Sequence, residues 1–179
     1  IDSIIVNDQK TKELNIGHGL AGDVTQEFTL EKKFVEDSGW LNFLAMSVQK
    51  WIKVMQNNEI KNFNLIGTWV VRQFKNEYNP VHWHAGHISG AGFLKVPSTF
   101  GEHFQKKENQ RYRGGNLTLI HGTKQFLSNS KFEIVPEVGD FYFFPNYLMH
   151  TVYPFKGTDE ERRSISFNAS IDQNIYNKI

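Results

Sequence analysis

Apolar residues recur at helical spacing in the segment that follows Asp37 and Ser38. Either polar residue is suited to cap a helix, and the apolar positions continue to about Asn57. The pattern predicts one long amphipathic helix whose apolar stripe, rich in aromatic residues, packs against a sheet. A shorter helix is expected just before it, built around the apolar residues Phe28, Leu30, Phe34 and Val35.

After Asn64 the pattern changes to short apolar stretches separated by turn residues, which is typical of strands. The predicted strands cover residues 66–74, 87–96, 116–120, 132–135, 140–144, 149–153 and 162–169. A further short strand is predicted at 1–6, and a glycine-rich loop at 15–25. Many short strands after an N-terminal helix predict an α+β, mainly β chain whose sheet part is a sandwich or a jelly-roll barrel.

The chain of 179 residues is expected to form a single domain, with an N-terminal region at 1–63 and a barrel core at about 64–172. Apolar residues make up 39% of it, and it contains 15 Phe, 6 Tyr and 4 Trp, which excludes a disordered chain. One long connection, 97–115, is rich in charged residues. We expect it to border the mouth of a binding site.

Charge, hydropathy and the absence of cysteine exclude several kinds of partner and site. The net charge is +1 with both signs interspersed, so no nucleic-acid partner is expected. No apolar run is long enough to cross a membrane, and we expect a soluble, cytoplasmic protein. Without cysteine, disulfides, thiolate metal ligands and a cysteine nucleophile are excluded. Any metal must then bind histidine, carboxylate or water, ligands that suit iron, manganese, zinc or nickel.

A histidine cluster is the first candidate for such a site. His82, His84 and His87 lie close together, and His82-x-His84 reads as the end of a strand, where alternate side chains point to one face. Both imidazoles can then bind one metal ion, and His150, which follows a predicted buried strand, can complete the set. The alternative is ordinary surface histidine, or core histidine with satisfied ring nitrogens. Trp83, which alternates with its histidine neighbours, is expected in the core.

The second candidate is the strand that begins at Arg162. Its period of two places one set of polar side chains on a single face: Arg162, Ser164, Ser166 and Asn168. Facing into a barrel, a guanidinium fork beside a serine hydroxyl is suited to bind a ligand carboxylate. The alternative is that Arg162 pairs with Glu160 or Glu161 on the surface.

Together these motifs resemble the 2-oxoglutarate- and iron(II)-dependent oxygenase superfamily. The similarity rests on the order and spacing of the histidine pair, residues 89–95, the stretch from Gly139 through Pro145 to His150, and Arg162-x-Ser164. It covers roughly residues 67–170, and it is greatest to a bacterial and phage group related to prolyl hydroxylases.

The resemblance implies a double-stranded β-helix, a jelly-roll and cupin-like barrel, that binds one iron(II) ion, 2-oxoglutarate and dioxygen. His82 and His150 match the two histidine ligand positions, and Arg162 with Ser164 matches the residues that bind the cosubstrate carboxylate. The superfamily usually has Asp or Glu two residues after the first histidine, whereas this chain has His84. We therefore expect three histidine ligands, all with catalytic roles.

Other residues have weaker assignments. His87 is the competing ligand for the position of His84, and the candidates for orienting cosubstrate or substrate are Tyr78, Asn79, Thr118 and His121. The implied reaction is hydroxylation of a prolyl or other peptidyl residue, or of a small metabolite. The alternatives are a three-histidine cupin-type dioxygenase or isomerase that uses no 2-oxoglutarate, and a non-catalytic jelly-roll binding protein. Nothing in the sequence bears on the oligomeric state.

Overall fold

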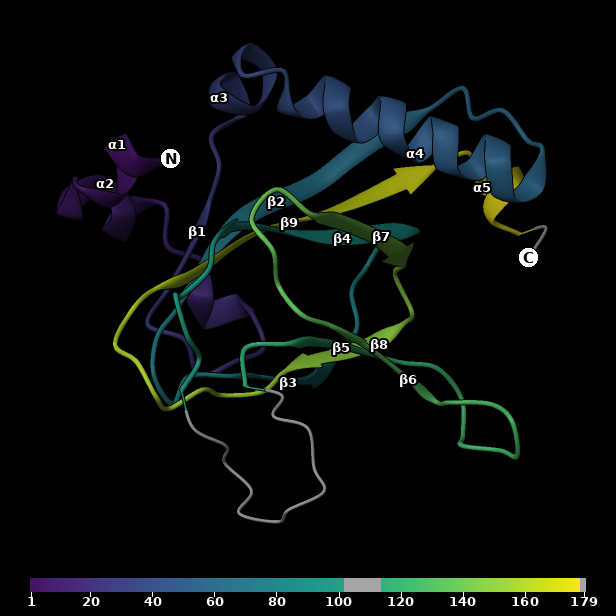
Figure 1. Ribbon diagram of the computed structural model, residues 1–179. Helices are drawn as coiled ribbons and strands as arrows, with labels where there is room; N and C mark the ends of the chain where they lie inside the picture. Colours follow the sequence, from purple (N-terminus) through teal and green to yellow (C-terminus); the bar gives the residue numbers. More distant parts are fainter. Residues whose placement is uncertain (102–113, 178–179) are drawn as a thin grey trace.

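The computed structural model describes residues 1–101 and 114–177, in which two antiparallel sheets lie one above the other (Figure 1). One sheet has the order β1-β2-β9-β4-β7 and the other the order β3-β8-β5-β6. From β2 onward the chain passes back and forth between the two sheets, except that β5 and β6 form a hairpin within the four-stranded sheet. The strands are β1 (Gln26–Thr29), β2 (Phe63–Gln73), β3 (Asn79–His82), β4 (Ile88–Lys95), β5 (Leu117–Ile120), β6 (Lys131–Ile134), β7 (Phe141–Pro145), β8 (Met149–Val152) and β9 (Arg162–Ile171).

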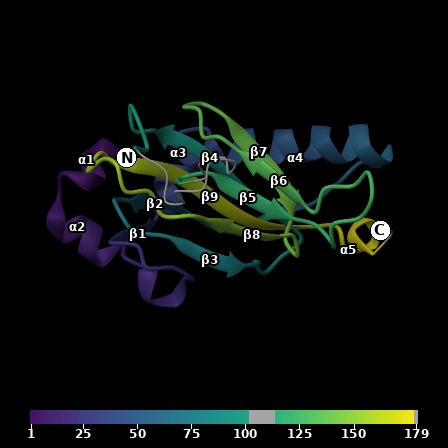
Figure 2. The ribbon, with the colours of Figure 1, turned by 60° about the horizontal axis from the view of Figure 1, so that its bottom comes forward.

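The helices lie outside the barrel. They are α1 (Asp2–Ile5), α2 (Asp8–Glu13), the 3-10 helix η1 (Gly17–Gly19), α3 (Lys32–Asp37), α4 (Trp40–Gln56) and α5 (Gln173–Tyr176). The view in Figure 2 brings the four-stranded sheet forward and shows α1 and α2 at one end of the molecule and α5 at the other. The chain is mainly β, as predicted.

The long helix α4 covers the outer face of the five-stranded sheet (Figure 1). Leu44 and Val48 on α4 are completely buried and pack in one cluster with Phe167 and Ala169 of β9. Because strand residues alternate, these two β9 positions face the helix while their neighbours face the barrel interior. The predicted packing of an N-terminal helix on the sheet is therefore confirmed. None of the helices in the described parts of the chain is long and apolar enough to cross a membrane.

The packing of aromatic side chains from β7 and β9 against β4 depends on small residues. A Cβ atom built on Gly92 collides with the ring of Phe141, and one built on Gly90 lies 2.6 Å from a ring carbon of Phe167. Glycine at these positions lets the aromatic rings lie directly against the strand.

Two predictions for the N-terminal region are wrong. Residues 1–6 contain helix α1 rather than a strand, because Ile1, Ile4 and Ile5 have helical spacing and pack together against the sheet. Residues 26–29 form strand β1 rather than part of a helix, and only the later residues of the expected short helix belong to α3. Phe28 is fully buried where β1 pairs with the edge of β2.

The predicted strands after Asn64 are all present, with shifts of up to three residues at their ends. The expected core position of Trp83 is wrong, since this side chain is 66% exposed. It follows β3, an edge strand of the four-stranded sheet, so no neighbouring strand covers it. The connection 97–115 is predicted to border the mouth of a binding site. Most of it, residues 102–113, lies outside the described residues, so this stays a prediction.

Candidate metal and cosubstrate site

The structure brings His82, His84 and His150 together between the two sheets. One ring nitrogen of each lies within 4.8 Å of the others. His82 ends β3 and is paired with His150 of β8, and the centroids of their rings are 4.2 Å apart. His84 lies just beyond β3, with its ring centroid 4.9 Å from each of the other two. The two histidines of the His-x-His pair therefore meet His150 of β8, although only His82 lies within β3.

Backbone carbonyls fix the tautomer of two of these imidazoles. The Nδ1 atom of His82 is 2.7 Å from the carbonyl oxygen of Pro80, and Nδ1 of His150 is 2.9 Å from that of Leu148. A carbonyl oxygen only accepts, so Nδ1 carries the hydrogen in both rings and Nε2 presents its lone pair. This is how histidine ligands are commonly oriented toward a metal ion.

The third imidazole is positioned through Asn146, the residue that follows β7. The backbone N–H of His84 donates to the carbonyl oxygen of Asn146, and the Asn146 side-chain amide donates to the carbonyl oxygen of His84, both at 3.1 Å. The hydroxyl of Tyr176 on α5 donates to the Asn146 amide oxygen at 3.1 Å. The indole ring of Trp69 contacts the His84 ring edge-on at 5.6 Å. His84 is thus held from both its backbone and its ring.

Burial keeps two of the histidines neutral. It lowers the pKa of His84 to about 3, with further contributions from the charges of His150 and His82. Burial likewise lowers the pKa of His150 to about 4, assisted by the charge of His82. Neutral imidazole is the form that binds metal.

The donor set fits a metal ion. The Nε2 atoms of His84 and His150 are 3.1 Å apart, and His150 presents a lone pair there. Nitrogen ligands that bind one metal ion through bonds of about 2.1 Å lie roughly 3.0 to 3.4 Å apart, so this pair of nitrogens could bind one ion. No carboxylate belongs to the cluster among the described residues. The arrangement is therefore a three-nitrogen site of the kind that suits iron, zinc, copper or nickel.

Arg162 lies in the same cavity and is 2% exposed. Its Nε donates to the carbonyl oxygen of Gly115 at 2.8 Å, and one terminal nitrogen donates to the hydroxyl of Ser164 at 3.4 Å. Burial lowers the pKa of Arg162 to about 10, so it remains charged at neutral pH. The guanidinium forms no ion pair within residues 1–101 and 114–177. A buried cation of this kind fits the carboxylate of a bound ligand.

The alternative that Arg162 pairs with its acidic neighbours is wrong for the described residues. Glu160 instead accepts hydrogen bonds from the backbone and hydroxyl of Ser98. Glu161 points to the opposite face and pairs with Arg72 and Arg163. The alternation along β9 therefore separates a largely buried ion-pair cluster outside the barrel from a guanidinium that points into it.

The three histidines and Arg162 line one cavity of about 270 Å³. Small side chains of β4 and β9 form part of its wall, and aromatic and aliphatic side chains form most of the rest. Trp83 lines it while remaining largely exposed, so it lies where the cavity meets solvent. The site thus combines a metal-binding cluster, a buried cation and space for a small molecule.

Comparison with known proteins identifies the family. The sequence model of the family described as "Putative 2OG-Fe(II) oxygenase" matches residues 67–168. The chain belongs to this family. The match runs from within β2 into β9 and includes His82, His84, His150 and Arg162, and it confirms the resemblance seen in the motifs. No curated protein sequence matches the chain.

Solved structures of 2-oxoglutarate oxygenases share the fold. A prolyl-4-hydroxylase from Pseudomonas putida is 16% identical, with a TM-score of 0.57 over 93% of this chain and 82% of that one. The 2-oxoglutarate complex of the viral collagen prolyl hydroxylase from Paramecium bursaria Chlorella virus-1 is 15% identical, with a TM-score of 0.55 over 89% and 87%. A prolyl hydroxylase from Trichoplax adhaerens, in complex with a hypoxia inducible factor peptide fragment, is 13% identical, with a TM-score of 0.52 over 87% and 67%.

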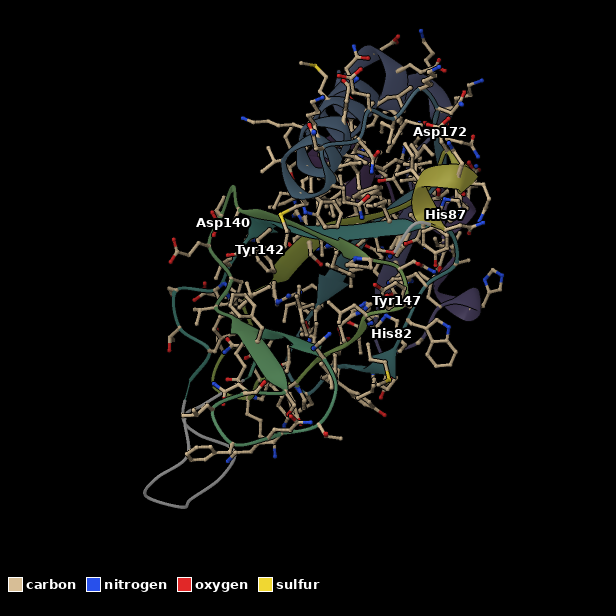
Figure 3. All side chains as sticks on the ribbon, turned by 90° about the vertical axis from the view of Figure 1, so that its right-hand side faces the viewer. His82, His87, Asp140, Tyr142, Tyr147 and Asp172 are labelled. Carbon is tan, nitrogen blue, oxygen red and sulfur yellow. The ribbon has the colours of Figure 1, made fainter. Side chains whose placement is uncertain are left out.

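The remaining predicted site residues of this oxygenase are distributed differently. His87 does not join the cluster: its Nδ1 accepts the backbone N–H of Ile171 at 3.0 Å, and its ring stacks on Tyr176 at 4.1 Å. Figure 3 shows His87 next to α5 and apart from His82. His87 therefore belongs to the contact between the barrel and α5, and the structure does not place it as an alternative ligand.

Of the four weaker candidates only Asn79 lines the cavity. Tyr78 is 42% exposed and pairs through its backbone with Asp23. Thr118 lies on the opposite face of β5 from the cavity residue Leu117, and its hydroxyl is buried without a hydrogen-bond partner among the described residues. His121 is exposed beyond the end of β5. The structure thus places Tyr78, Thr118 and His121 away from the cavity.

Two parts of the site were not predicted. Asn146, which positions His84, follows a predicted strand but carries no motif that marks it. The N-terminal region contributes Gly19, Leu20, Ala21 and Glu27 to the cavity wall, although this stretch shows no recognisable chemistry in sequence. Its contribution depends on β1 joining the edge of the five-stranded sheet.

Proposed function

We propose that this chain couples the decarboxylation of 2-oxoglutarate to the hydroxylation of an organic substrate, with iron(II) bound by His82, His84 and His150. The observation that carries the proposal is the buried guanidinium of Arg162, which has no carboxylate partner among the described residues and shares a cavity with the three histidines. Arg162 and Ser164 would bind the far carboxylate of 2-oxoglutarate. Family membership supports the choice of metal and cosubstrate.

The roles of the protein groups follow from their surroundings. When bound, the iron ion supplies the chemistry that activates dioxygen while 2-oxoglutarate is converted to succinate and carbon dioxide. The carbonyls of Pro80 and Leu148 keep the ligand nitrogens free of protons. Arg162 and the hydroxyl of Ser164 offer several N–H and O–H donors to a carboxylate, and their burial strengthens that interaction. Apolar walls exclude water from the reacting groups.

We infer that the substrate is a peptidyl residue, with proline the first candidate and a small metabolite the second. Prolyl hydroxylases among the proteins of similar fold support this choice. The exposed indole of Trp83 at the cavity mouth offers an apolar surface on which a peptide can lie.

The test of the cosubstrate site compares two arginines on adjacent positions of β9. With iron(II) added without oxygen, 2-oxoglutarate binding is measured by calorimetry for the wild type, Arg162→Gln and Arg163→Gln. We expect Arg162→Gln to weaken binding about 100-fold, because a charge-assisted carboxylate contact contributes ~3 kcal/mol. Arg163 faces away and pairs with Glu161 and Asp2, so its variant keeps cosubstrate affinity although it loses stability.

Turnover is then measured as succinate released in air, with a panel of proline-containing peptides and free amino acids. Mass spectrometry should show the gain of one oxygen atom in the product. Equal cosubstrate affinity of wild type and Arg162→Gln would refute the proposed carboxylate site. Metal binding without any 2-oxoglutarate binding would favour a three-histidine cupin-type enzyme, and absence of metal binding would favour a binding protein without catalytic activity.

A further inference from the structure

Glu27 is an acidic side chain on the wall of the proposed substrate cavity, 3% exposed. It lies on β1 opposite Val71 of β2, which in turn lies opposite Ser164 of β9. All three residues line the cavity, so they form one row across the inner face of the sheet. With strands about 4.8 Å apart, the backbone of Glu27 is about 10 Å from that of Ser164. The carboxyl therefore belongs to the wall away from the cosubstrate site.

No cation neutralises this carboxyl within the described parts of the chain. Its hydrogen-bond partner is the side chain of Asn79, whose Nδ2 also donates to the carbonyl oxygen of Ala21 at 2.9 Å. Lys12 and His18 line a neighbouring surface depression that Glu27 also borders, yet neither pairs with it. Burial raises the pKa of Glu27 to about 7; the bond from Asn79 opposes this rise, and the charge of Glu77 adds to it. A buried carboxylate without a cationic partner is unfavourable, so a positively charged group that enters the cavity would stabilise it.

Two aromatic side chains of the cavity also favour a positively charged partner at Glu27. The indole of Trp69, itself 6% exposed, and that of Trp83 line it, and aromatic faces attract cations. A second anion near Glu27 would be repelled, whereas an ammonium or guanidinium group would form a charge-assisted hydrogen bond in a site shielded from water.

We propose that Glu27 determines substrate specificity by binding a cationic nitrogen, an ammonium or guanidinium group, of the substrate. This inference rests on the proposed function in one respect: the cavity takes an organic substrate beside the metal. Glu27 lies outside the metal cluster and is a substrate-positioning residue. Among peptidyl substrates the proposal favours those with a lysine, an arginine or a free amino terminus close to the reacting residue.

The test uses two probes of similar size that differ in charge, n-butylammonium and n-butanol. Their affinities for the zinc-loaded full chain are measured at pH 8 by NMR titration, with and without 2-oxoglutarate. We expect wild type to bind the ammonium about tenfold more tightly than the alcohol, the ratio that a hydrogen bond to a charged group provides. In Glu27→Gln, which keeps the size of the side chain, we expect this preference to disappear. Glu13→Gln, an exposed change of the same charge, should retain it.

Equal affinity of wild type for the two probes overturns the proposal, and so does an ammonium preference that survives in Glu27→Gln. The wild-type comparison does not depend on the folding of any variant. The outcome is also separate from that of the proposed function: if wild type fails to bind 2-oxoglutarate, the oxygenase proposal fails while the probe preference can still be read. Glu27→Gln retains Arg162 and should still bind 2-oxoglutarate, which a general collapse of the cavity would prevent.

Discussion

Glu161 connects the N-terminal region to the strand that carries the cosubstrate site, and its replacement tests how firmly that strand is held. Its carboxylate is 6% exposed and accepts hydrogen bonds from Arg72 on β2 and from two nitrogens of Arg163 on β9. Arg163 also pairs with Asp2 of α1. The cluster fixes the start of β9 and therefore the inward orientation of Arg162. We predict that Glu161→Gln destabilises the fold near neutral pH.

The magnitude follows from the pKa of Glu161. Burial alone would raise this pKa, but the hydrogen bonds and charges of Arg163 and Arg72 outweigh burial and lower it from 4.5 to about 2. At ~1.4 kcal/mol for each pKa unit, the folded state gains ~3 kcal/mol from the ionised form. A carboxyl with a lower pKa in the folded chain binds fewer protons there. Its contribution is therefore complete above the unperturbed value of 4.5 and is lost as the pH falls toward 2.

The assay is urea denaturation at intervals from pH 7 to pH 2. As the pH falls through the acidic part of this range, the free energy of unfolding of the wild type should decrease by ~3 kcal/mol more than that of Glu161→Gln. At pH 7 the variant should be less stable than the wild type by a similar amount. Glu160→Gln removes the neighbouring exposed carboxyl and should change stability little. Parallel curves for wild type and Glu161→Gln between pH 5 and pH 2 would show that the cluster contributes no net stability.

Two further substitutions test the positioning of His84 and the packing of α4. Asn146→Ala removes the amide that links His84 to Tyr176, and we expect metal affinity, measured by competition with a chelator, to fall about tenfold or more. Unchanged affinity would mean that the backbone contact alone holds His84. Leu44→Ala should lower the free energy of unfolding, measured by urea denaturation, by ~3 kcal/mol because the Leu44 side chain is completely buried. Met46→Ala should lower it little, because the Met46 side chain is 70% exposed. Similar costs for both would contradict the packing of α4 on the sheet.

The barrel and the centre of the site could be predicted because their signals are local. Period-two alternation in residues 162–169 separates Arg162 from Arg163, and the structure shows these two guanidinium groups in opposite environments. The His-x-His spacing likewise brings two rings to one face. His84 in place of an acidic residue could be read directly from the sequence, and the structure places its ring within the cluster.

The edges of the fold could not be predicted, because they depend on contacts between distant segments. Phe28 and Leu30 alternate as in a strand, but β1 forms only because the free edge of β2, far along the chain, accepts it. Trp83 is exposed because β3 is itself an edge strand, which the pattern of its own residues does not reveal. Asn146 and Glu27 are single polar residues without a motif, and their surroundings exist only in the folded chain.

The proposals for Arg162 and Glu27 are connected through charge. Histidine ligands contribute no negative charge to the site, so the two carboxylates of 2-oxoglutarate would balance a bound divalent ion, while Arg162 adds a positive charge. If its charge lies about 10 Å from a carboxylate of the cosubstrate, an ionised Glu27 would repel that carboxylate by ~2 kcal/mol at an effective dielectric constant of about 20. A cationic group of the substrate at Glu27 removes this repulsion. The same charge that selects the substrate would therefore favour binding of cosubstrate and substrate together.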